Sequence, residues 1–416
     1  MKMNKEMLHL LNLDFVTQVT MFRAGSEYLQ SLYDGNKEVL IFPIHFRFFT
    51  SYVLNSRIIN SNNEITAEDV ITEFVGKEFR RIKSRYYEKE NLQRLGKDGE
   101  NFIDIPVIDF IKNLKDLLKG FEVSKKHILI AIYGAYHKSI GRDIFSLKVF
   151  WHHAHLYSEA IEFERVFPKV KLLINVRNPM AIFYAIQKSY KPKFKDLKSY
   201  NYSLLKESIL NLREWCFELN NKSIKKDFEL TLFIKLEDLP RDIEIMRISK
   251  FLGVSFDEIN FISTWAGHEW KGDAISAKTY KADEKWSLNR SYNGWREGLS
   301  CREKFIISYL FENFIEKFKY LDNTKKSRGF LDDIKYFLFI LFPLKTEQHF
   351  FSIAYYKAKF KQKDIEWYDP KIGIYRKRNS LIMILFYFFY EFLLLIELRL
   401  TFITLFFLRR NNLKFP

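Results

Sequence analysis

Apolar residues along the chain gather in short runs that predict buried strands, separated by longer segments of helical composition. These runs cover Thr17 to Met21, Glu38 to Pro43, Lys148 to Trp151, Lys171 to Val176 and Leu232 to Asp238. Continuous apolar strands are typical of parallel sheets, because helices cover both faces of such a sheet. The pattern therefore predicts an α/β domain with a central, mainly parallel sheet flanked by helices.

The segments between these runs predict helices and loops. A helix is expected from Ser26, which can cap it, and another from Ser158 to Phe167, where Pro168 ends it. The polar sequence His152-His153-Ala154-His155 predicts a loop after the preceding strand. His127 to Gly134 is an apolar run whose length leaves helix and strand both open.

The last quarter of the chain differs from the rest. Its apolar run from Leu381 to Leu408 is long enough to cross a bilayer, which needs about 20 residues, yet the run contains Glu391, Glu397 and Arg399. Basic clusters flank the run on both sides, so the positive-inside rule does not orient a single span. We therefore expect an α/β domain over residues 1–322 and a helical C-terminal extension over residues 323–416. The extension is expected to contact a membrane surface through residues 376–416. The alternative is a helix buried against a second subunit, in a homo-oligomer.

The composition is that of a folded, basic protein. Of the 416 residues 47% are hydrophobic, with 42 Phe and 23 Tyr, which is ample for a core and argues against disorder. The net charge is +16, and residues 325–416 hold 17 Lys and Arg against 8 Asp and Glu. Such an excess suits an anionic membrane face, an acidic glycan or nucleic acid. Because the chain has no zinc-finger, helix-turn-helix or RNP pattern, we expect no nucleic-acid partner.

The cysteines and the N-terminus bear on location. Cys216 and Cys301 fit neither a metal pattern nor a disulfide framework, as in a reducing cytosol. Met1 to Leu13 contains no apolar run of signal-peptide length. We therefore expect a cytoplasmic protein that is peripheral or monotopic at the inner membrane face.

The stretch from Val19 to Leu32 predicts a strand, a tight turn and a helix, and the turn carries candidate chemistry. Gly25 permits the left-handed backbone of a sharp turn. A helix that begins directly after a strand aims its N–H groups and positive dipole end at the turn, and Arg23 adds a full charge. The turn therefore predicts a phosphate or sulfate site. The P-loop ending Gly-Lys-Ser/Thr is missing, which disfavours an ATPase, a GTPase or a nucleotide kinase.

The same turn, Arg23-Ala24-Gly25-Ser26-Glu27, resembles the 5′-phosphosulfate loop of sulfotransferases that use 3′-phosphoadenosine 5′-phosphosulfate (PAPS), whose pattern begins Arg/Lys-Ser-Gly-Thr-Thr/Ser. The cation, the glycine and one hydroxyl are kept. Glu27 departs from the pattern, and its carboxylate must point outward to avoid repelling the ligand. The resemblance implies a P-loop-like domain in which these five residues bind the phosphosulfate and Arg23 stabilises the bridging oxygen.

A second block, Leu172 to Pro179, resembles the 3′-phosphate motif of this family, an apolar strand that ends in Arg-Asp/Asn-Pro. The resemblance implies that Arg177 binds the 3′-phosphate of PAPS. The family places a serine further on where this chain has Ala185, so Gln187 or Ser189 is the expected replacement.

Two later blocks continue the resemblance in the family's order. Leu232 to Asp238 with Ile248 to Val254 matches a strand-Glu-Asp-Leu … Phe-Leu-Gly pattern. The segment from Arg290 to Arg296 resembles one that closes over the nucleotide in bacterial members. By the resemblance, Arg290, Trp295 and Arg296 are expected nucleotide contacts.

Sulfuryl transfer needs a base for the acceptor hydroxyl, and the sequence offers two histidines. One branch of the family places a carboxylate after the second strand, at about the position of His45. The other uses a histidine ahead of the 3′-phosphate strand, at close to the spacing of His155. Imidazole changes its charge near neutral pH, so both stay candidates. No metal is expected, because the histidines at 152, 153 and 155 have no fourth ligand near them in the sequence.

The resemblance thus implies a sulfotransferase that moves a sulfuryl group from PAPS to a hydroxyl of a carbohydrate, a glycolipid or a related acceptor. The aromatic content suits sugar stacking, and the basic tail suits a membrane. The alternative is a non-catalytic, basic, membrane-associated protein with a degenerate nucleotide-binding fold. Ala24, Glu27 and Ala185 are the substitutions that such decay would produce.

Overall fold

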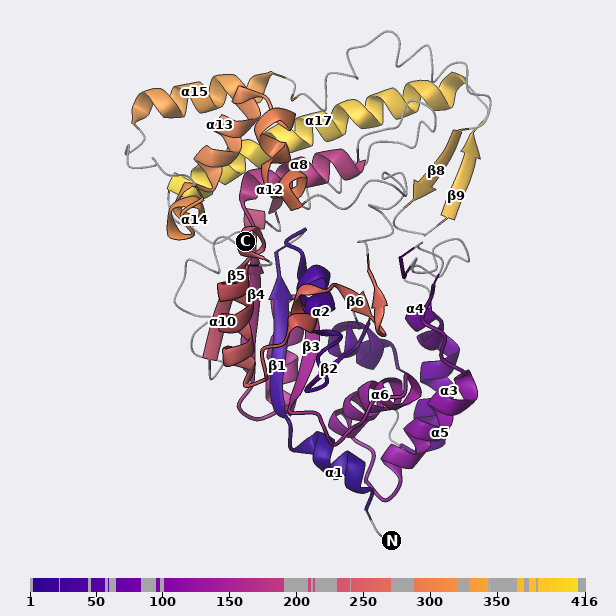
Figure 1. Ribbon diagram of the computed structural model, residues 1–416. Coiled ribbons are helices and arrows are strands. Elements are labelled where there is room, and N and C mark those ends of the chain that lie inside the picture. Colours follow the sequence, from indigo (N-terminus) through magenta and orange to yellow (C-terminus); the bar gives the residue numbers. More distant parts are fainter. Residues whose placement is uncertain are drawn as a thin grey trace. The chain divides into compact units, whose positions relative to one another are not determined.

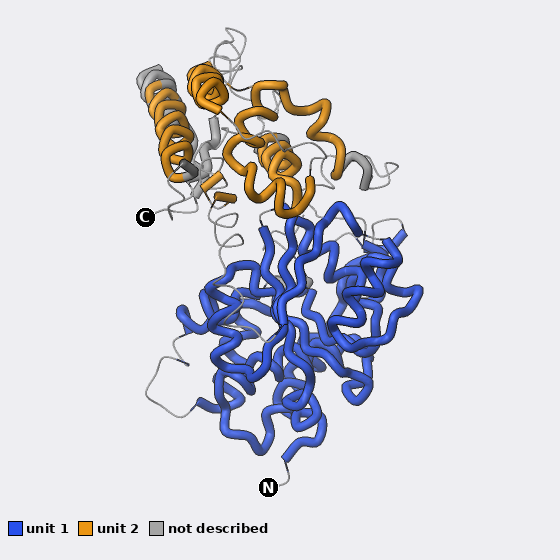
Figure 2. The backbone as a smooth tube through the Cα atoms, turned by 90° about the vertical axis from the view of Figure 1, so that its left-hand side faces the viewer, with its two compact units in different colours: residues 1–176, 223–287 blue, residues 177–222, 288–416 orange. Residues whose placement is uncertain are grey.

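The chain folds into two compact units, shown in different colours in Figure 2. The computed structural model describes residues 3–21, 23–43, 46–56, 59, 65–83, 95–97, 101–190, 209–210, 212–213, 230–239, 241–270, 288–320, 329–342, 344, 365–369, 374–378 and 381–410. Unit 1 consists of residues 1–176 and 223–287, and unit 2 of residues 177–222 and 288–416. These units divide the chain at other points than the boundary predicted near residue 322, which stays a prediction.

Unit 1 is built on a five-stranded parallel sheet with the order β2-β3-β1-β4-β5 (Figure 1). Its strands are β1 (Asp14–Thr20), β2 (Val39–Ile41), β3 (Val149–His155), β4 (Lys171–Val176) and β5 (Leu230–Lys235). Every pairing in this sheet is parallel. The predicted α/β class, with a central parallel sheet flanked by helices and a helical C-terminal part, is confirmed.

Helices cover both faces of this sheet. Those of unit 1 are α1 (Lys5–Leu11), α2 (Ser26–Tyr33), α3 (Ala67–Lys77), α4 (Phe79–Lys83), α5 (Val107–Leu118), α6 (Lys125–Ser139), α7 (Tyr157–Val166) and α10 (Asp242–Leu252), with the π-helix η1 (Phe48–Val53), the 3₁₀ helices η4 (Leu236–Asp238) and η5 (Glu258–Phe261), and the hairpin β6 (Thr264–Trp265) and β7 (His268–Glu269).

Two successive residues of β3 show which helices share a face. The Phe150 ring lies 4.6 Å from Tyr133 of α6 and 6.1 Å from Phe163 of α7, between ring centroids. Trp151 packs instead against Tyr33 of α2, at 5.5 Å. Successive side chains of a strand point to opposite faces. Helix α2 therefore covers one face, and α6 and α7 cover the other.

The strand order reverses at β1, which positions the candidate site. The chain leaves β1 through α2 to reach β2 on one side, and it later leaves β3 through α7 to reach β4 on the other side of β1. In open α/β sheets, ligands bind beyond the carboxyl ends of the strands at such a reversal point. A ligand-binding site is therefore expected at the residues that follow β1.

Unit 2 is mostly helical. It contains α8 (Pro179–Tyr190), α12 (Leu288–Gly298), α13 (Cys301–Leu310), α14 (Glu312–Lys317), α15 (Phe330–Leu341), the antiparallel strands β8 (Ile365–Asp369) and β9 (Ile374–Arg378), and α17 (Leu381–Arg410). Helix α8 packs on α12 and α13, and α13 packs on α15 and α17. Among the residues that the structure describes, no helix is long and apolar enough to cross a membrane.

Most predicted strands and helices form where the apolar runs place them, with two corrections. The predicted strand over residues 171–176 matches β4 residue for residue, and His127 to Gly134 lies within α6. The prediction of a loop at His152-His153-Ala154-His155 is wrong, because β3 continues to His155. The strand predicted to end at Asp238 ends at Lys235, and a 3₁₀ turn follows.

Candidate functional site

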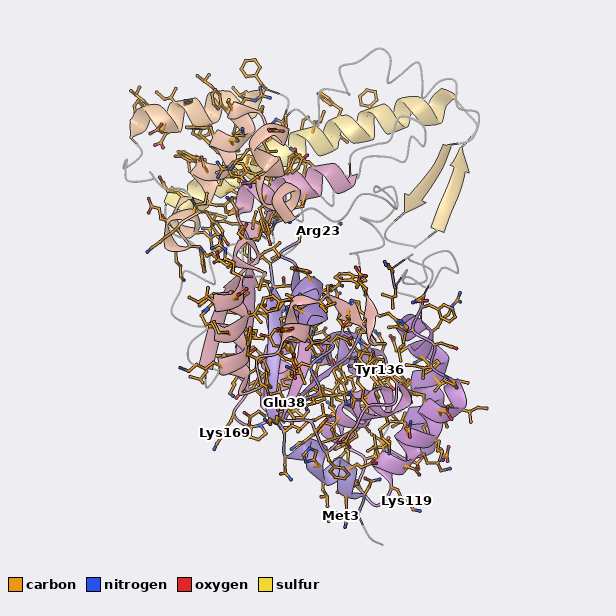
Figure 3. The ribbon with its side chains drawn as sticks, in the orientation of Figure 1. Met3, Arg23, Glu38, Lys119, Tyr136 and Lys169 are labelled. Atoms are coloured by element: carbon orange, nitrogen blue, oxygen red, sulfur yellow. The ribbon has the colours of Figure 1, made fainter. Side chains whose placement is uncertain are left out.

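The turn between β1 and α2 lies at the carboxyl edge of the sheet of unit 1. Figure 3 shows Arg23 beyond the end of β1, with Glu38 and Lys169 at the opposite edge. The Ala24 N–H donates to the Met21 carbonyl at 3.0 Å, which closes the turn. Arg23 is half-buried and adopts a left-handed backbone with φ of 58°. For a non-glycine residue that conformation is uncommon and marks a constrained position.

Gly25 is the N-cap residue of α2, with φ of 74° and ψ of 31°. A Cβ at this position would lie 2.5 Å from Leu236 Cδ1, in the turn that follows β5. A side chain at this position would strain the backbone, and Leu236 would have to shift to make room for it. The prediction that Ser26 caps the helix is wrong, because Ser26 is the first helical residue and α2 has no side-chain cap. The first turn of α2 thus follows directly on the turn that contains Arg23.

Gln18, which the sequence analysis did not identify as a site residue, connects this turn to the sheet. Its side chain is fully buried in β1. Its amide nitrogen donates to the Ser26 carbonyl at 3.1 Å and to Asn175 Oδ1 of β4 at 2.6 Å. Its amide oxygen accepts a hydrogen bond from Trp151 Nε1 of β3 at 3.0 Å. One side chain therefore connects the start of α2 to the strands on both sides of β1.

His155 ends β3 at the same edge of the sheet. It pairs in register with Val19 of β1, next to an irregularity in the pairing after Gln18. Its backbone is also left-handed, with φ of 63°, and its side chain is half-buried. The ring centroid lies 5.5 Å from that of His153. Unit 1 thus places a predicted base and a predicted anion ligand after neighbouring strands.

His152 points to the other face of the sheet and belongs to a buried polar chain. Its Nδ1 lies 2.9 Å from the Tyr133 hydroxyl, and its Nε2 lies 3.6 Å from Glu159 Oε1. Glu159 accepts hydrogen bonds from the backbone N–H groups of Phe49 and Thr50, each at 2.7 Å. Glu159 therefore fixes the start of η1, the segment that follows His45, one of the two predicted bases.

The charge states of Glu159 and Tyr133 follow from their surroundings. Burial raises the pKa of the Glu159 carboxyl, but the His152 ring and the N–H groups of Thr50 and Phe49 more than offset burial, so the pKa lies below its ordinary value of 4.5. Burial raises the pKa of the Tyr133 hydroxyl well above its ordinary value. Glu159 is thus an anion at neutral pH, and the Tyr133 hydroxyl is neutral.

The other predicted nucleotide ligands belong to unit 2. Arg177 follows the last residue of β4 and is buried, and Asn178 Oδ1 accepts from the Met180 N–H at the start of α8. Trp295 of α12 is buried, and the exposed Arg296 guanidinium lies over its ring at 4.9 Å. These roles stay predictions.

Three predicted residues cannot be placed with their side chains. His45 lies outside the described residues, and Ser189 and Arg290 lie in helices whose side chains are outside the described part at those positions. Gln187, the other expected replacement for the missing serine, donates from Nε2 to Glu303 Oε1 at 3.0 Å. Its amide is therefore already used in the contact of α8 with α13.

The structure describes no metal centre. Among the described residues, no group of three His, Cys, Asp or Glu side chains could hold a metal ion. The strand alternation of β3 explains this for the histidine cluster, because His152 faces Tyr133 and Glu159 while His153 and His155 lie ring to ring.

Comparison with known proteins finds likeness only among solved structures. No family model matches the chain, and no curated protein matches it. The sulfotransferase domain of the olefin synthase of Synechococcus PCC 7002 is 14% identical with a TM-score of 0.37, and the match covers 72% of this chain and 95% of that domain. The sulfotransferase domain from the curacin biosynthetic pathway is 14% identical with a TM-score of 0.39, covering 72% of this chain and 98% of that domain. Sulfotransferase STF9 from Mycobacterium avium is 10% identical with a TM-score of 0.32, covering 75% and 78%. At these values the likeness does not assign the chain to a family.

Proposed function

We propose that this protein is a sulfotransferase that uses PAPS as its donor and acts on a hydroxyl of a carbohydrate or glycolipid. The observation that carries the proposal is the pair of left-handed residues, Arg23 and His155, at the carboxyl edge of the sheet of unit 1. A left-handed backbone at a non-glycine residue costs about 1–3 kcal/mol and gathers at functional sites. Here the left-handed residues are a cation, Arg23, which follows β1, and an imidazole, His155, which ends the neighbouring strand β3, at the point where the strand order reverses.

The turn residues fit the phosphosulfate end of such a donor. The Arg23 guanidinium would bind the anionic oxygens, and the first N–H groups of α2 would add backbone donors and the positive end of the helix dipole. Gly25 adopts the left-handed backbone with which α2 begins, and Leu236 occupies the space that a Cβ would fill. When bound, PAPS supplies the sulfuryl group and leaves as 3′,5′-ADP. Arg23 would then stabilise the charge that develops on the leaving phosphate oxygen.

His155 would take the proton from the acceptor hydroxyl. Its ring lies at the end of β3, one strand away from the turn, and it is half-buried, so part of the residue is accessible to an acceptor. The prediction that His45 serves instead stays open, and Glu159 would then have the task of fixing the backbone after it. The resemblance supports Arg177 as the ligand of the 3′-phosphate.

The proposal is tested by binding and by turnover, measured separately. We expect the wild type to bind 3′,5′-ADP in calorimetry and Arg23→Ala to weaken binding at least tenfold, because a hydrogen-bonded charge contributes about 1.5–3 kcal/mol. His155→Ala should keep the binding and lower the transfer of labelled sulfate from PAPS to glycan or glycolipid extracts by roughly 10²-fold or more. Arg177→Ala tests the 3′-phosphate role in the same assay.

Matched controls separate the site from general effects of charge. Arg165→Ala removes an exposed arginine on α7, which leads to the amino edge of the sheet, and should leave binding unchanged. His127→Ala removes a half-buried histidine at the start of α6 that contacts Ser124. Equal binding by wild type and Arg23→Ala would refute the proposal. Binding of 3′,5′-ADP with no transfer to any extract would favour the non-catalytic alternative.

A further inference from the structure

The turn that carries His155 has a strained backbone. The Leu156 N–H donates to the Ala154 carbonyl at 2.7 Å, and His155 between them has φ of 63°. A hydrogen bond between residues two apart, around a residue with positive φ, marks the rarer and strained kind of γ-turn. Helix α7 begins directly afterwards, and its N-cap residue Leu156 provides no side-chain hydrogen bond. The turn therefore needs contacts from elsewhere in the fold to keep this conformation.

Two side chains that flank this turn in the sequence meet in the core of unit 1. His152 of β3 comes three residues before His155, and Glu159 of α7 comes four residues after it. His152 Nε2 lies 3.6 Å from Glu159 Oε1, and both side chains are fully buried. The His152 ring also stacks on Phe163, one helical turn further along α7, at 5.0 Å between ring centroids and 9° between ring planes. One residue of β3 is thus held by two successive turns of α7.

Glu159 is itself held by a third segment, the π-helix η1. Its Oε1 accepts from the Phe49 N–H and its Oε2 from the Thr50 N–H, each at 2.7 Å. Both N–H groups belong to the first turn of η1, whose N-cap residue provides no side-chain hydrogen bond. Both carboxylate oxygens therefore have donors, as a buried charge requires. π-Helical turns are rare and occur frequently at functional sites. We call His152, Glu159 and these two N–H groups the clasp.

Packing alone does not explain a carboxylate at this place. Replacing a buried charged pair by apolar side chains of similar volume is often neutral or stabilising, because the loss of hydration offsets most of the attraction between the charges. What the carboxylate adds is direction. Its contacts with two adjacent N–H groups and an imidazole fix where the start of α7 lies relative to β3 and η1. The turn between β3 and α7 is thereby fixed at both of its ends.

We propose that Glu159 positions the imidazole of His155 for proton transfer, because the clasp holds the strained turn on which His155 lies. The proposal rests on the proposed function, in which His155 takes the proton from the acceptor hydroxyl. Glu159 is a positioning residue that acts through His152 and the backbone of the turn. A base must come within about 2.6–3.2 Å of the atom that carries the proton, and a misplacement of about 1 Å can cost 10²-fold in rate. A contact in the core can therefore control the rate of transfer.

Glu159→Gln in the full chain is the first test, because glutamine keeps the shape of the side chain but replaces one acceptor oxygen by an N–H₂ group. One of the N–H groups of Phe49 and Thr50 then loses its acceptor. We expect amide hydrogen exchange, measured by mass spectrometry, to become at least tenfold faster in peptides that cover residues 48–53 and 153–160. The kcat for sulfuryl transfer from PAPS should fall at least tenfold. The affinity for 3′,5′-ADP should stay within twofold, because Arg23 and the first turn of α2 are not part of the clasp.

A second variant, His152→Phe, separates the two parts of the clasp. It keeps a ring stacked on Phe163 and leaves the two N–H bonds of Glu159 in place, but it removes the imidazole nitrogens. Exchange should become faster at residues 153–160 and stay as in the wild type at residues 48–53, with kcat at least tenfold lower. The matched control is Glu162→Gln, the same substitution on the same helix, where the partner is the exposed Arg165. It should match the wild type in exchange, kcat and affinity.

Wild-type exchange in α5 (Val107–Leu118) shows that a variant is folded. Unchanged exchange at residues 153–160 in Glu159→Gln would overturn the proposal, and so would faster exchange with an unchanged kcat. An equal loss of kcat and of affinity for 3′,5′-ADP would also overturn it, since that result indicates general destabilisation. If Glu159→Gln does not fold, His152→Phe decides on the same measurements. A wild type that transfers no sulfuryl group would refute the proposed function instead, and faster exchange in the two variants would still show that the clasp holds the turn.

Discussion

Replacing Gln18 by leucine tests whether the turn at Arg23 depends on the strand below it. Leucine has about the same volume as glutamine, so the substitution removes hydrogen bonds without opening a cavity. It deprives Trp151 Nε1 and Asn175 Oδ1 of their partner, and it releases the Ser26 carbonyl from β1. The change therefore acts on the start of α2 without replacing any predicted ligand.

The expected loss can be estimated from these contacts. A buried polar group left without its partner costs about 1–3 kcal/mol, and Gln18→Leu leaves two such groups in a fully buried site. Leucine recovers part of this because its side chain is apolar. We expect unit 1 to lose about 2–4 kcal/mol of stability. The affinity for 3′,5′-ADP should fall, because the first turn of α2 is no longer held to the sheet.

Amide hydrogen exchange measured by mass spectrometry reports this loss locally. Peptides that cover residues 14–33 should exchange faster by a factor on the order of 10², since each 1.4 kcal/mol is about tenfold. Thr17→Val, on the same strand, is the control. Its hydroxyl is buried and has no hydrogen-bond partner among the described residues, so its loss should leave exchange within about threefold. Unchanged exchange in Gln18→Leu, with nucleotide affinity as in the wild type, would refute the reasoning.

Two further predictions concern unit 1. Gly25→Ala should destabilise the fold by more than Gly253→Ala. Both glycines have a left-handed backbone, which costs alanine about 1–2 kcal/mol, but of the two only Gly25 has a neighbour, Leu236, that the new Cβ would meet. Equal melting temperatures of the two variants would contradict this prediction. Burial, with Arg142 nearby, lowers the pKa of His137 from 6.5 to about 4, so below pH 6.5 the unfolded chain binds a proton that the folded chain does not. The free energy of unfolding should therefore fall by roughly 2 kcal/mol between pH 7 and pH 5. Urea unfolding curves at the two pH values measure this loss, and His137→Gln should remove the contribution of His137 to it. The same pH dependence in wild type and variant would contradict the prediction.

The strands of the sheet could be predicted from the sequence because local pattern decides them. The residues of β4 form a continuous apolar run, as a strand covered on both faces requires, and the prediction matches its bounds. The position of Arg23 after β1 follows from the same pattern. These features depend on neighbours in the sequence, which a reading of hydrophobic positions captures.

Features that depend on distant partners could not be predicted. His152 looks like a loop residue, yet it is buried in β3 because Tyr133 and Glu159 supply its polar contacts. Gln18 is a single polar residue within a run predicted as a buried strand, and its partners on β3 and β4 lie 133 and 157 residues away. Ser26 carries the usual signature of a cap, but Gly25 takes the cap position. For His152 and Gln18 a tertiary contact decided the outcome.

The chain passes from one compact unit to the other after residues 176, 222 and 287, and this has a consequence during synthesis. Helix α8 leaves the ribosome about 100 residues before α12, the helix on which it packs. Synthesis adds about 5–20 residues per second, so the apolar side chains of α8, among them Ile182, Phe183 and Ile186, exist for roughly 5–20 s before α12 has been made. The nascent chain should therefore need a chaperone most during that interval, after β4 has been made and before the second half of the helical unit arrives.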